Sequence, residues 1–194
     1  MLCAFRAILT DPRSRFLPSN TLSRQPLSVR WRSFRRHPSL QLPRRWRGWL
    51  LDSGSLTARL VALSEGDFRV EVVDQGWGRP NLSEARALRI DPRLRVLVRE
   101  VRLIGRDQAW VHARSLIPAT TLTGPHRKLA HLGSRPLGEV LFQDPSMERS
   151  PIETALVPLY RDNQKAWARR SVFRLDGKPL LVSEVFLPQL LALQ

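Results

Sequence analysis

Residues 179–188 constrain the fold of this chain most, because they are almost all apolar and begin one residue after an Asp-Gly pair. Asp176-Gly177 between two apolar runs is the strongest β-hairpin signal in the sequence, with residues 171–175 as the first strand. Alternate residues of the second strand point to opposite faces, and both faces are mainly apolar. The sequence therefore predicts a hairpin whose second strand faces core or cavity on either side.

Glu184 is the one charged residue inside that second strand. A buried, unpaired carboxylate costs several kcal/mol or binds a proton, so Glu184 needs a cation, a hydrogen-bond donor or a ligand. A two-residue turn at 176–177 sets Arg169 directly opposite Glu184, which predicts a cross-strand ion pair. Alternatively, Glu184 lines a ligand cavity.

Arg99 is the corresponding exception in the apolar segment 94–104, where it shares a face with Leu97, Val101 and Leu103. One interpretation packs its aliphatic stem on the sheet and places its charge in solvent at a strand end. The other places Arg99 and Glu184 in one pocket. There the arginine could bind a carboxylate with its two-pronged guanidinium, and the glutamate could meet a hydroxyl.

Residues 105–108 form a predicted hairpin loop, and residues 109–117 return as the next strand, which ends at Pro118. With a loop of those four residues, Ile104 faces Ala109 and Arg99 faces Arg114 on the same side of the sheet. Two arginines in that position would favour an anionic ligand. A change of one residue in the loop length would remove the pairing.

The remaining pattern alternates strands with short helices. Ser53 or Ser55 can cap a helix that ends near Leu63, and residues 68–73 alternate as a strand. Residues 80–88 form a loop or short helix, and residues 126–132 and 136–142 form two helices that could cover a pocket as a lid. The sequence predicts a single α+β domain with an antiparallel sheet of about six strands.

The positive charge of the chain is concentrated at its N-terminus. The net charge is +15, but residues 1–47 hold eleven arginines and one acid, whereas the remainder holds 21 basic and 16 acidic residues. Residues 1–45 are rich in Pro, Ser and Arg without hydrophobic periodicity, so we expect a disordered extension before a domain of residues 46–194. A tail or over-long start, a targeting peptide and a nucleic-acid-binding arm are three interpretations, and the absence of an aromatic-basic module argues against the last.

Composition also limits the chemistry. The single cysteine, Cys3, excludes an intramolecular disulfide and agrees with a reducing compartment, so we expect a cytoplasmic protein. The four histidines lack metal-ligand spacing, which predicts no metal. No apolar run approaches about 18 residues, so we expect no membrane insertion. No serine has a histidine and an acid at recognisable spacing, which argues against nucleophilic hydrolysis.

Several short motifs together resemble a known family. They are Val98-Arg99-Glu100-Val101, Ala113-Arg114-Ser115-Leu116-Ile117-Pro118, Thr121-Leu122-Thr123-Gly124-Pro125, Pro136-Leu137-Gly138, and Gly177-Lys178-Pro179 through Glu184 to Pro188. In their order and spacing, over most of residues 46–188, the chain resembles the bacterial chorismate pyruvate-lyases, which make 4-hydroxybenzoate for ubiquinone. The resemblance implies a monomer with a six-stranded antiparallel sheet, an internal cavity roofed by helical flaps, and no cofactor.

The resemblance also implies the site. The substrate-contacting residues of the family fall on Arg99, Leu137 and Glu184, with a looser contact at Leu56. Arg99 would bind the ring carboxylate of chorismate, Glu184 its hydroxyl, and the Leu137 amide a ligand oxygen. We add Arg114 as an expected contact of the enolpyruvyl carboxylate. Ala113 replaces a glycine of the family pattern, which implies a slightly tighter cavity.

Two alternatives belong to other classes of protein. The same fold serves as the effector domain of certain bacterial repressors, so the chain could bind an aromatic acid as a sensor or carrier without catalysis. A basic RNA-binding protein would instead show a salt-sensitive affinity that disappears when residues 1–45 are deleted. The placement of Arg99 and Glu184 favours the lyase, with a small-molecule substrate and no nucleic-acid partner.

Overall fold

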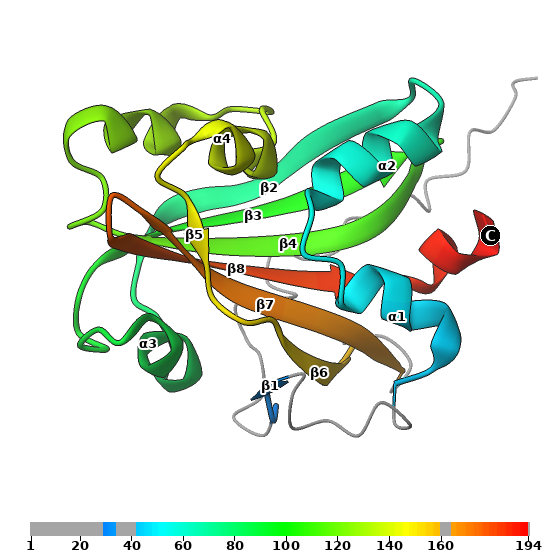
Figure 1. Cartoon of the computed structure of the whole chain (residues 1–194), viewed down its shortest axis with the longest axis horizontal. Helices are drawn as coiled ribbons and strands as arrows, with labels where there is room; N and C mark the ends of the chain where they lie inside the picture. The colour runs from blue at the N-terminus through cyan, green and yellow to red at the C-terminus, as the bar shows by residue number, and fades with distance from the viewer. Residues whose placement is uncertain (1–28, 34–41, 160–163, 194) are drawn as a thin grey trace, which may run out of the picture.

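The computed structural model, which describes residues 29–33, 42–159 and 164–193, is built around one antiparallel sheet (Figure 1). Its strand order is β1-β6-β7-β8-β4-β3-β2, and β5 pairs with β7 outside this path. The strands are β1 (Arg32–Ser33), β2 (Phe68–Gly78), β3 (Val96–Gly105), β4 (Gln108–Pro118), β5 (Glu148–Arg149), β6 (Glu153–Pro158), β7 (Lys165–Leu175) and β8 (Lys178–Phe186). Six long strands and two short ones confirm the predicted α+β class.

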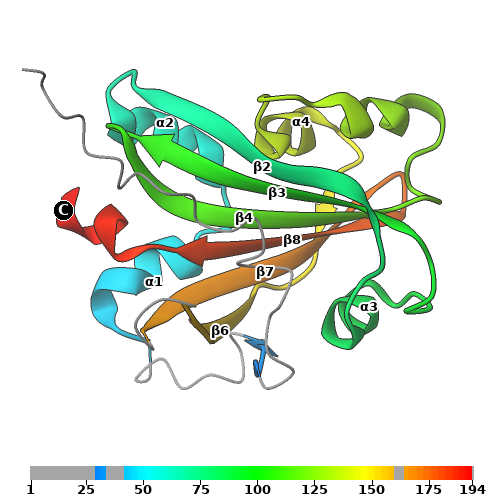
Figure 2. The same ribbon diagram turned by 180° about the vertical axis from the view of Figure 1, so that it is seen from behind.

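The helices cover the two faces of the sheet unequally. They are α1 (Arg44–Leu50), α2 (Leu56–Ser64), α3 (Leu82–Leu88), α4 (Leu137–Gln143) and the 3₁₀ helices Gly124–His131 and Pro188–Leu193. Figure 1 shows α1, α2 and α4 in front of the sheet, and the reverse view in Figure 2 shows α3 on the other side. We call these the cavity face and the α3 face.

The hairpin of β7 and β8 has the predicted turn. Asp176 and Gly177 both have positive φ, 48° and 75°, as the tight two-residue turns of hairpins require. The strands therefore pair from Leu175 opposite Lys178, and Arg169 lies opposite Glu184. This part of the register was readable from the sequence.

The hairpin of β3 and β4 begins as predicted and then departs from the prediction. Ile104 faces Ala109, but the register shifts by one residue at the next pair, because Trp110 is an extra residue on β4. The indole is completely buried against Gly105, where any side chain would collide with the ring. The predicted pairing of Arg99 with Arg114 is therefore wrong, and Arg99 faces Ser115.

Some segments contain more strand than the sequence predicted. β2 continues to Gly78 past an irregularity after Val72, β7 begins at Lys165, and β6 was not predicted. The helix predictions hold with small changes: Ser55 caps α2 by accepting a hydrogen bond from the Ala58 amide, and the segment near His126 is a 3₁₀ helix.

The folded part starts before residue 46. Arg32 and Ser33 pair with β6, Leu42 is almost fully buried, and α1 begins at Arg44. The predicted boundary of the domain is corrected for these residues. The rest of the expected disordered extension, residues 1–28 and 34–41, lies outside the described part of the chain.

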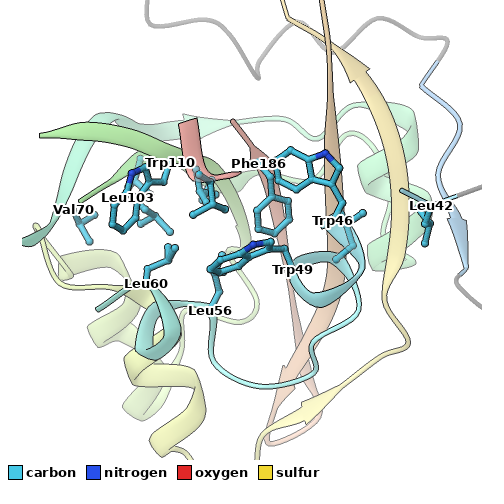
Figure 3. Packing of buried hydrophobic residues seen from close by; sticks show 14 residues of the cluster. Leu42, Trp46, Trp49, Leu56, Leu60, Val70, Leu103, Trp110 and Phe186 are labelled. Carbon is cyan, nitrogen blue, oxygen red and sulfur yellow. The ribbon is translucent and has the colours of Figure 1, made fainter. Parts of the chain in front are cut away.

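A tryptophan-rich core joins α1 and α2 to the sheet (Figure 3). Trp46 and Trp49 pack against Phe186 of β8 with ring centroids 6.2 and 6.4 Å apart, in tilted arrangements. Tilted aromatic pairs add about 0.5–1.5 kcal/mol beyond area burial. This core holds the end of β8 and the loop before α2 together, and Glu184 lies two residues before Phe186 on the same face.

No helix in the described ranges is both long and apolar enough to cross a membrane.

Candidate active site

A cavity lies between the sheet and the segments that cover the cavity face. Its floor comes from β2, β3, β4, β7 and β8, and its cover from α2, α4, β5 and the loop before α2. Its volume is about 550 Å³, including the part that opens to solvent. Most lining residues are apolar, among them Leu56, Val101, Leu103, Leu137, Phe142 and Phe173. A mainly apolar cavity with a few polar groups is the usual form of a small-molecule site.

Two neighbouring cross-strand rows place the polar residues on the cavity floor. Arg99 of β3 faces Ser115 of β4, which faces Val182 of β8. Two residues along, Ala113 of β4 faces Glu184 of β8. With strands about 4.8 Å apart and a rise of about 3.4 Å per residue, the Cα atoms of Arg99 and Glu184 lie roughly 12 Å apart. The two predicted residues thus share one face of the sheet, at opposite ends of the cavity.

Arg99 is buried without a neutralising partner. The side chain is 1% exposed, and its Nη2 donates to the backbone carbonyls of Gly133 at 2.8 Å and Arg135 at 3.1 Å. Its Nε has no hydrogen-bond partner, and no carboxylate of the described residues forms an ion pair with it. Burial lowers the pKa of Arg99, because removal from water disfavours its charged form. An anionic ligand would compensate that charge.

Glu184 both forms the predicted cross-strand ion pair and lines the cavity. Arg169 donates from Nε to Glu184 Oε2 at 2.5 Å, which confirms the predicted cross-strand pair. Arg169 is itself held by the carbonyls of Trp49 and Asp52, at 2.8 and 2.7 Å from Nη1. Glu184 nevertheless lines the cavity. The ion pair thus orients a carboxylate that can still bind a ligand, because Arg169 donates to Oε2 and a carboxylate has a second oxygen that can accept.

The two leucines occupy equivalent places in the cover. Leu56 is the first residue of α2 and Leu137 the first residue of α4, and both are buried and line the cavity. First-turn amides of a helix have no carbonyl partner within it, so the Leu137 N–H has no acceptor within α4 and can donate to a ligand oxygen. A side chain at Gly138 would lie 2.8 Å from the hydroxyl of Thr57. The two helices therefore approach closely where they close the cavity.

Arg114 does not belong to the cavity. The bulge at Trp110 turns its side chain to the α3 face, where Nε donates to Glu84 at 2.9 Å and Nη1 donates to Glu100 at 2.5 Å. Burial lowers the pKa of Arg114, but Glu84 and Glu100 together raise it further, so the net shift is upward. Arg114 is thus a fully neutralised structural cation, and its predicted contact with a ligand does not fit the structure.

Arg149 is a cavity residue that the sequence did not reveal. It lies on β5, a strand of two residues without a hydrophobic pattern, and it lines the cavity beside Phe173. The only signal available was the unusual number of arginines. Ala113 also lines the cavity, and the tighter wall expected there stays a prediction.

A metal site is not apparent, since no three His, Cys, Asp or Glu side chains cluster within the described ranges. The polar groups of the cavity floor are arginines, one carboxylate and hydroxyls. Guanidinium groups and a carboxylate suit the recognition of an organic acid that carries a hydroxyl.

The fold and the cavity define the class first: an α+β domain with a cavity over one face of an antiparallel sheet. The family model described as chorismate lyase matches residues 27–193. The chain belongs to the chorismate lyase family.

Sequence relatives agree with this assignment. A Methylococcus capsulatus protein named "Probable chorismate pyruvate-lyase" is 44% identical over 154 residues, which cover 74% of this chain and 95% of the relative. A Thiobacillus denitrificans protein of the same name is 46% identical over 165 residues, covering 79% and 88% of the two chains. Among solved structures, the Staphylococcus aureus gene product SA0254 has a TM-score of 0.50 at 13% identity, covering 71% of this chain and 90% of its own. That likeness supports the fold alone.

Proposed function

We propose that this chain is a chorismate pyruvate-lyase, which releases pyruvate from chorismate and leaves 4-hydroxybenzoate. The observation that carries the proposal is the buried, unneutralised Arg99 on the same cavity face as Glu184, in a chain of the chorismate lyase family. The two relatives above are named for this activity. The residues that the proposal requires are those predicted from the sequence, apart from Arg114.

The roles follow from the chemistry of the substrate. Chorismate has a ring carboxylate at C1, an enolpyruvyl ether at C3 and a hydroxyl at C4. Arg99 binds the ring carboxylate, because it supplies the unneutralised charge at one end of the cavity. Glu184 accepts from the hydroxyl at the other end, and the Leu137 amide donates to a ligand oxygen. The substrate is held across the sheet floor by its two ends.

The reaction needs one bond broken and one hydrogen moved. The C3–O ether bond breaks, C4 loses its hydrogen, and the methylene carbon of the departing group gains one, so that the products are 4-hydroxybenzoate and pyruvate. Aromatisation of the ring supplies the driving force. The protein contributes by holding a reactive conformer and by balancing charge in a mainly apolar cavity that α2 and α4 cover.

We also propose that the enzyme works as a cytoplasmic monomer that supplies the ring precursor of ubiquinone. The single cysteine fits a reducing compartment. Sedimentation of the purified protein tests the monomer: a stable dimer at micromolar concentration would contradict it.

The test of the function is to incubate the protein with chorismate and to quantify 4-hydroxybenzoate and pyruvate together. We expect equimolar products from the wild type. Glu184→Gln preserves the shape of the side chain and removes its charge, and we expect it to lower kcat by about 100-fold or more. If chorismate remains intact while 4-hydroxybenzoate binds tightly, the chain is a sensor or carrier and the proposed function is wrong.

A further inference from the structure

Arg149 is a second cavity arginine without a carboxylate partner. Its Nε donates to the hydroxyl of Ser171 at 3.1 Å and its Nη1 to the carbonyl of Ser53 at 2.9 Å. The guanidinium lies 5.0 Å from the centre of the Phe173 ring. Arg149 forms no ion pair with a carboxylate of the described residues. The side chain is therefore oriented by neutral groups and keeps its full charge at the cavity wall.

The charge of Arg149 is unfavourable among the protein groups that surround it. Burial lowers its pKa, and the nearby Arg169 lowers it further, while Glu184 and Asp52 act in the opposite direction. Glu184 is already paired with Arg169 at 2.5 Å. An anion bound beside Arg149 would relieve both the burial and the repulsion, so this corner of the cavity favours a ligand with negative charge.

The position of Arg149 distinguishes it from Arg99. Arg149 Nη1 donates to the carbonyl of Ser53, and the carbonyl of the preceding Asp52 accepts from Arg169, the partner of Glu184, so Arg149 belongs to the Glu184 end of the cavity. It pairs with Phe173 on β7, whereas Arg99 lies on β3, three strands away in the order β7-β8-β4-β3. The cavity thus presents one unneutralised arginine at each end.

Chorismate has a matching distribution of charge. Its ring carboxylate lies at C1, whereas the enolpyruvyl group at C3 is next to the hydroxyl at C4. A substrate held with its ring carboxylate on Arg99 and its hydroxyl on Glu184 places its second carboxylate at the Glu184 end. We propose that Arg149 binds this enolpyruvyl carboxylate, the one that leaves with pyruvate; the inference rests on the proposed function.

The proposal gives Arg149 a distinct thermodynamic signature. 4-Hydroxybenzoate has only the ring carboxylate, so it has no group for Arg149. Arg149 would stabilise bound chorismate and bound pyruvate but not bound 4-hydroxybenzoate. Arg149 would therefore raise the affinity of the cavity for chorismate relative to 4-hydroxybenzoate. Ser171 would act as a positioning residue, because its hydroxyl accepts the hydrogen bond from Arg149 Nε.

The test compares Arg149→Met with the wild type on three ligands. We expect kcat/KM for chorismate to fall about 10- to 100-fold, the loss of one charge-assisted hydrogen-bonded pair. We expect the Kd of 4-hydroxybenzoate, measured by calorimetry, to stay within about twofold, and inhibition by pyruvate to weaken. An unchanged kcat/KM, or an equal loss for chorismate and 4-hydroxybenzoate, overturns the proposal.

Arg174→Met is a matched control, because Arg174 lies on β7 next to Phe173 and pairs with the other residue of β5, Glu148. Its side chain points to the opposite face from Phe173. We expect this variant to leave all three measurements unchanged. An effect equal to that of Arg149→Met would show that loss of charge near β5, and not contact with the substrate, is responsible.

A second variant keeps the proposal testable if Arg149→Met does not fold. Ser171→Ala removes only the acceptor that orients Nε, and it should lower kcat/KM for chorismate by about threefold to tenfold without weakening 4-hydroxybenzoate. If the wild type releases no 4-hydroxybenzoate, the proposed function fails separately. Binding of intact chorismate by calorimetry then still tests Arg149, which must affect chorismate and not 4-hydroxybenzoate.

Discussion

Arginines are buried on both faces of the sheet, but the two faces differ in whether carboxylates neutralise their charge. On the α3 face, Arg114 lies between Glu84 and Glu100, and Arg170 donates to Glu153 at 2.7 Å. On the cavity face, Arg169 is paired with Glu184, whereas the partners of Arg99 among the described residues are two backbone carbonyls. A buried arginine is therefore not in itself the mark of a ligand site. A ligand site is instead indicated by a buried arginine whose charge no carboxylate of the protein neutralises.

The α3 face carries a row of polar residues across the sheet. In order of the strands β6, β7, β8, β4, β3 and β2, it consists of Glu153, Arg170, Ser183, Arg114, Glu100 and Asp74. Helix α3 closes this row, since Glu84 completes a capping box with Asn81 and also accepts from Arg114. The row joins helix and sheet through paired charges, while the cavity face leaves space for a ligand.

Arg114→Met gives the largest effect expected from this comparison. Removing the arginine leaves Glu84 and Glu100 buried and unpaired, so we expect the free energy of unfolding to fall by about 3–5 kcal/mol. Urea denaturation followed by circular dichroism measures it. Arg102→Met is the control, because Arg102 pairs at 2.8 Å with the exposed Glu71 and should cost about 1 kcal/mol or less. Equal losses for the two variants would contradict the distinction between neutralised core charge and surface charge.

Arg99→Met tests the opposite face. The variant removes a buried charge that no carboxylate neutralises, so the free energy of unfolding should change by only about 1 kcal/mol, since two carbonyls lose a donor. The affinity for 4-hydroxybenzoate should fall about 100-fold, because its carboxylate loses a charge-assisted pair. Calorimetry and urea denaturation separate the two quantities. A destabilisation as large as that of Arg114→Met, with affinity preserved, would make Arg99 a structural residue.

Gly138→Ala addresses how the cavity face is closed. The added methyl group would lie 2.8 Å from Thr57 Oγ1, so either the Thr57 side chain or α4 must shift. We expect a loss of about 2 kcal/mol in the free energy of unfolding, typical of an overpacked contact, together with faster release of 4-hydroxybenzoate. The double variant with Thr57→Ala should recover most of this loss. Gly76→Ala is the control, since a methyl group added there would meet nothing within 4 Å.

The features that sequence could predict depend on local patterns. The Asp176-Gly177 turn determined the register of β7 and β8, and from it followed the pairing of Arg169 with Glu184. Alternation along β3 placed Arg99 on a face with Val101, which the cavity confirms. Both residues needed only the period of a strand and one recognisable turn.

The features that it could not predict depend on contacts between distant residues. The bulge at Trp110 exists because the indole packs on Gly105. The extra residue shifts the register by one, so that Arg114 lies on the other face of the sheet from Arg99. Strand β5 has two residues and becomes a strand only by pairing with β7, so nothing in its own sequence places Arg149 at the cavity. Short strands and bulges are decided by the partner, and a pattern along one segment does not contain that information.

His112 provides the smallest and most specific test of the α3 face. Burial, and then the charge of Arg102, lower its pKa from 6.5 to about 4. In the unfolded chain His112 binds a proton as the pH falls below about 6.5, whereas in the folded chain it does so only near pH 4. The contribution to the free energy of unfolding is therefore complete above pH 6.5 and is lost as the pH falls toward 4. Between pH 7 and about pH 5.5 this predicts a loss of about 1 kcal/mol in the free energy of unfolding.

His112→Asn should remove that part of the pH dependence. The burial-raised pKa of Glu100 acts with the opposite sign and remains in both proteins, so the difference between their pH profiles isolates the histidine. Identical profiles would show that this face admits the protonated imidazole, and that only its paired charges are shielded from water.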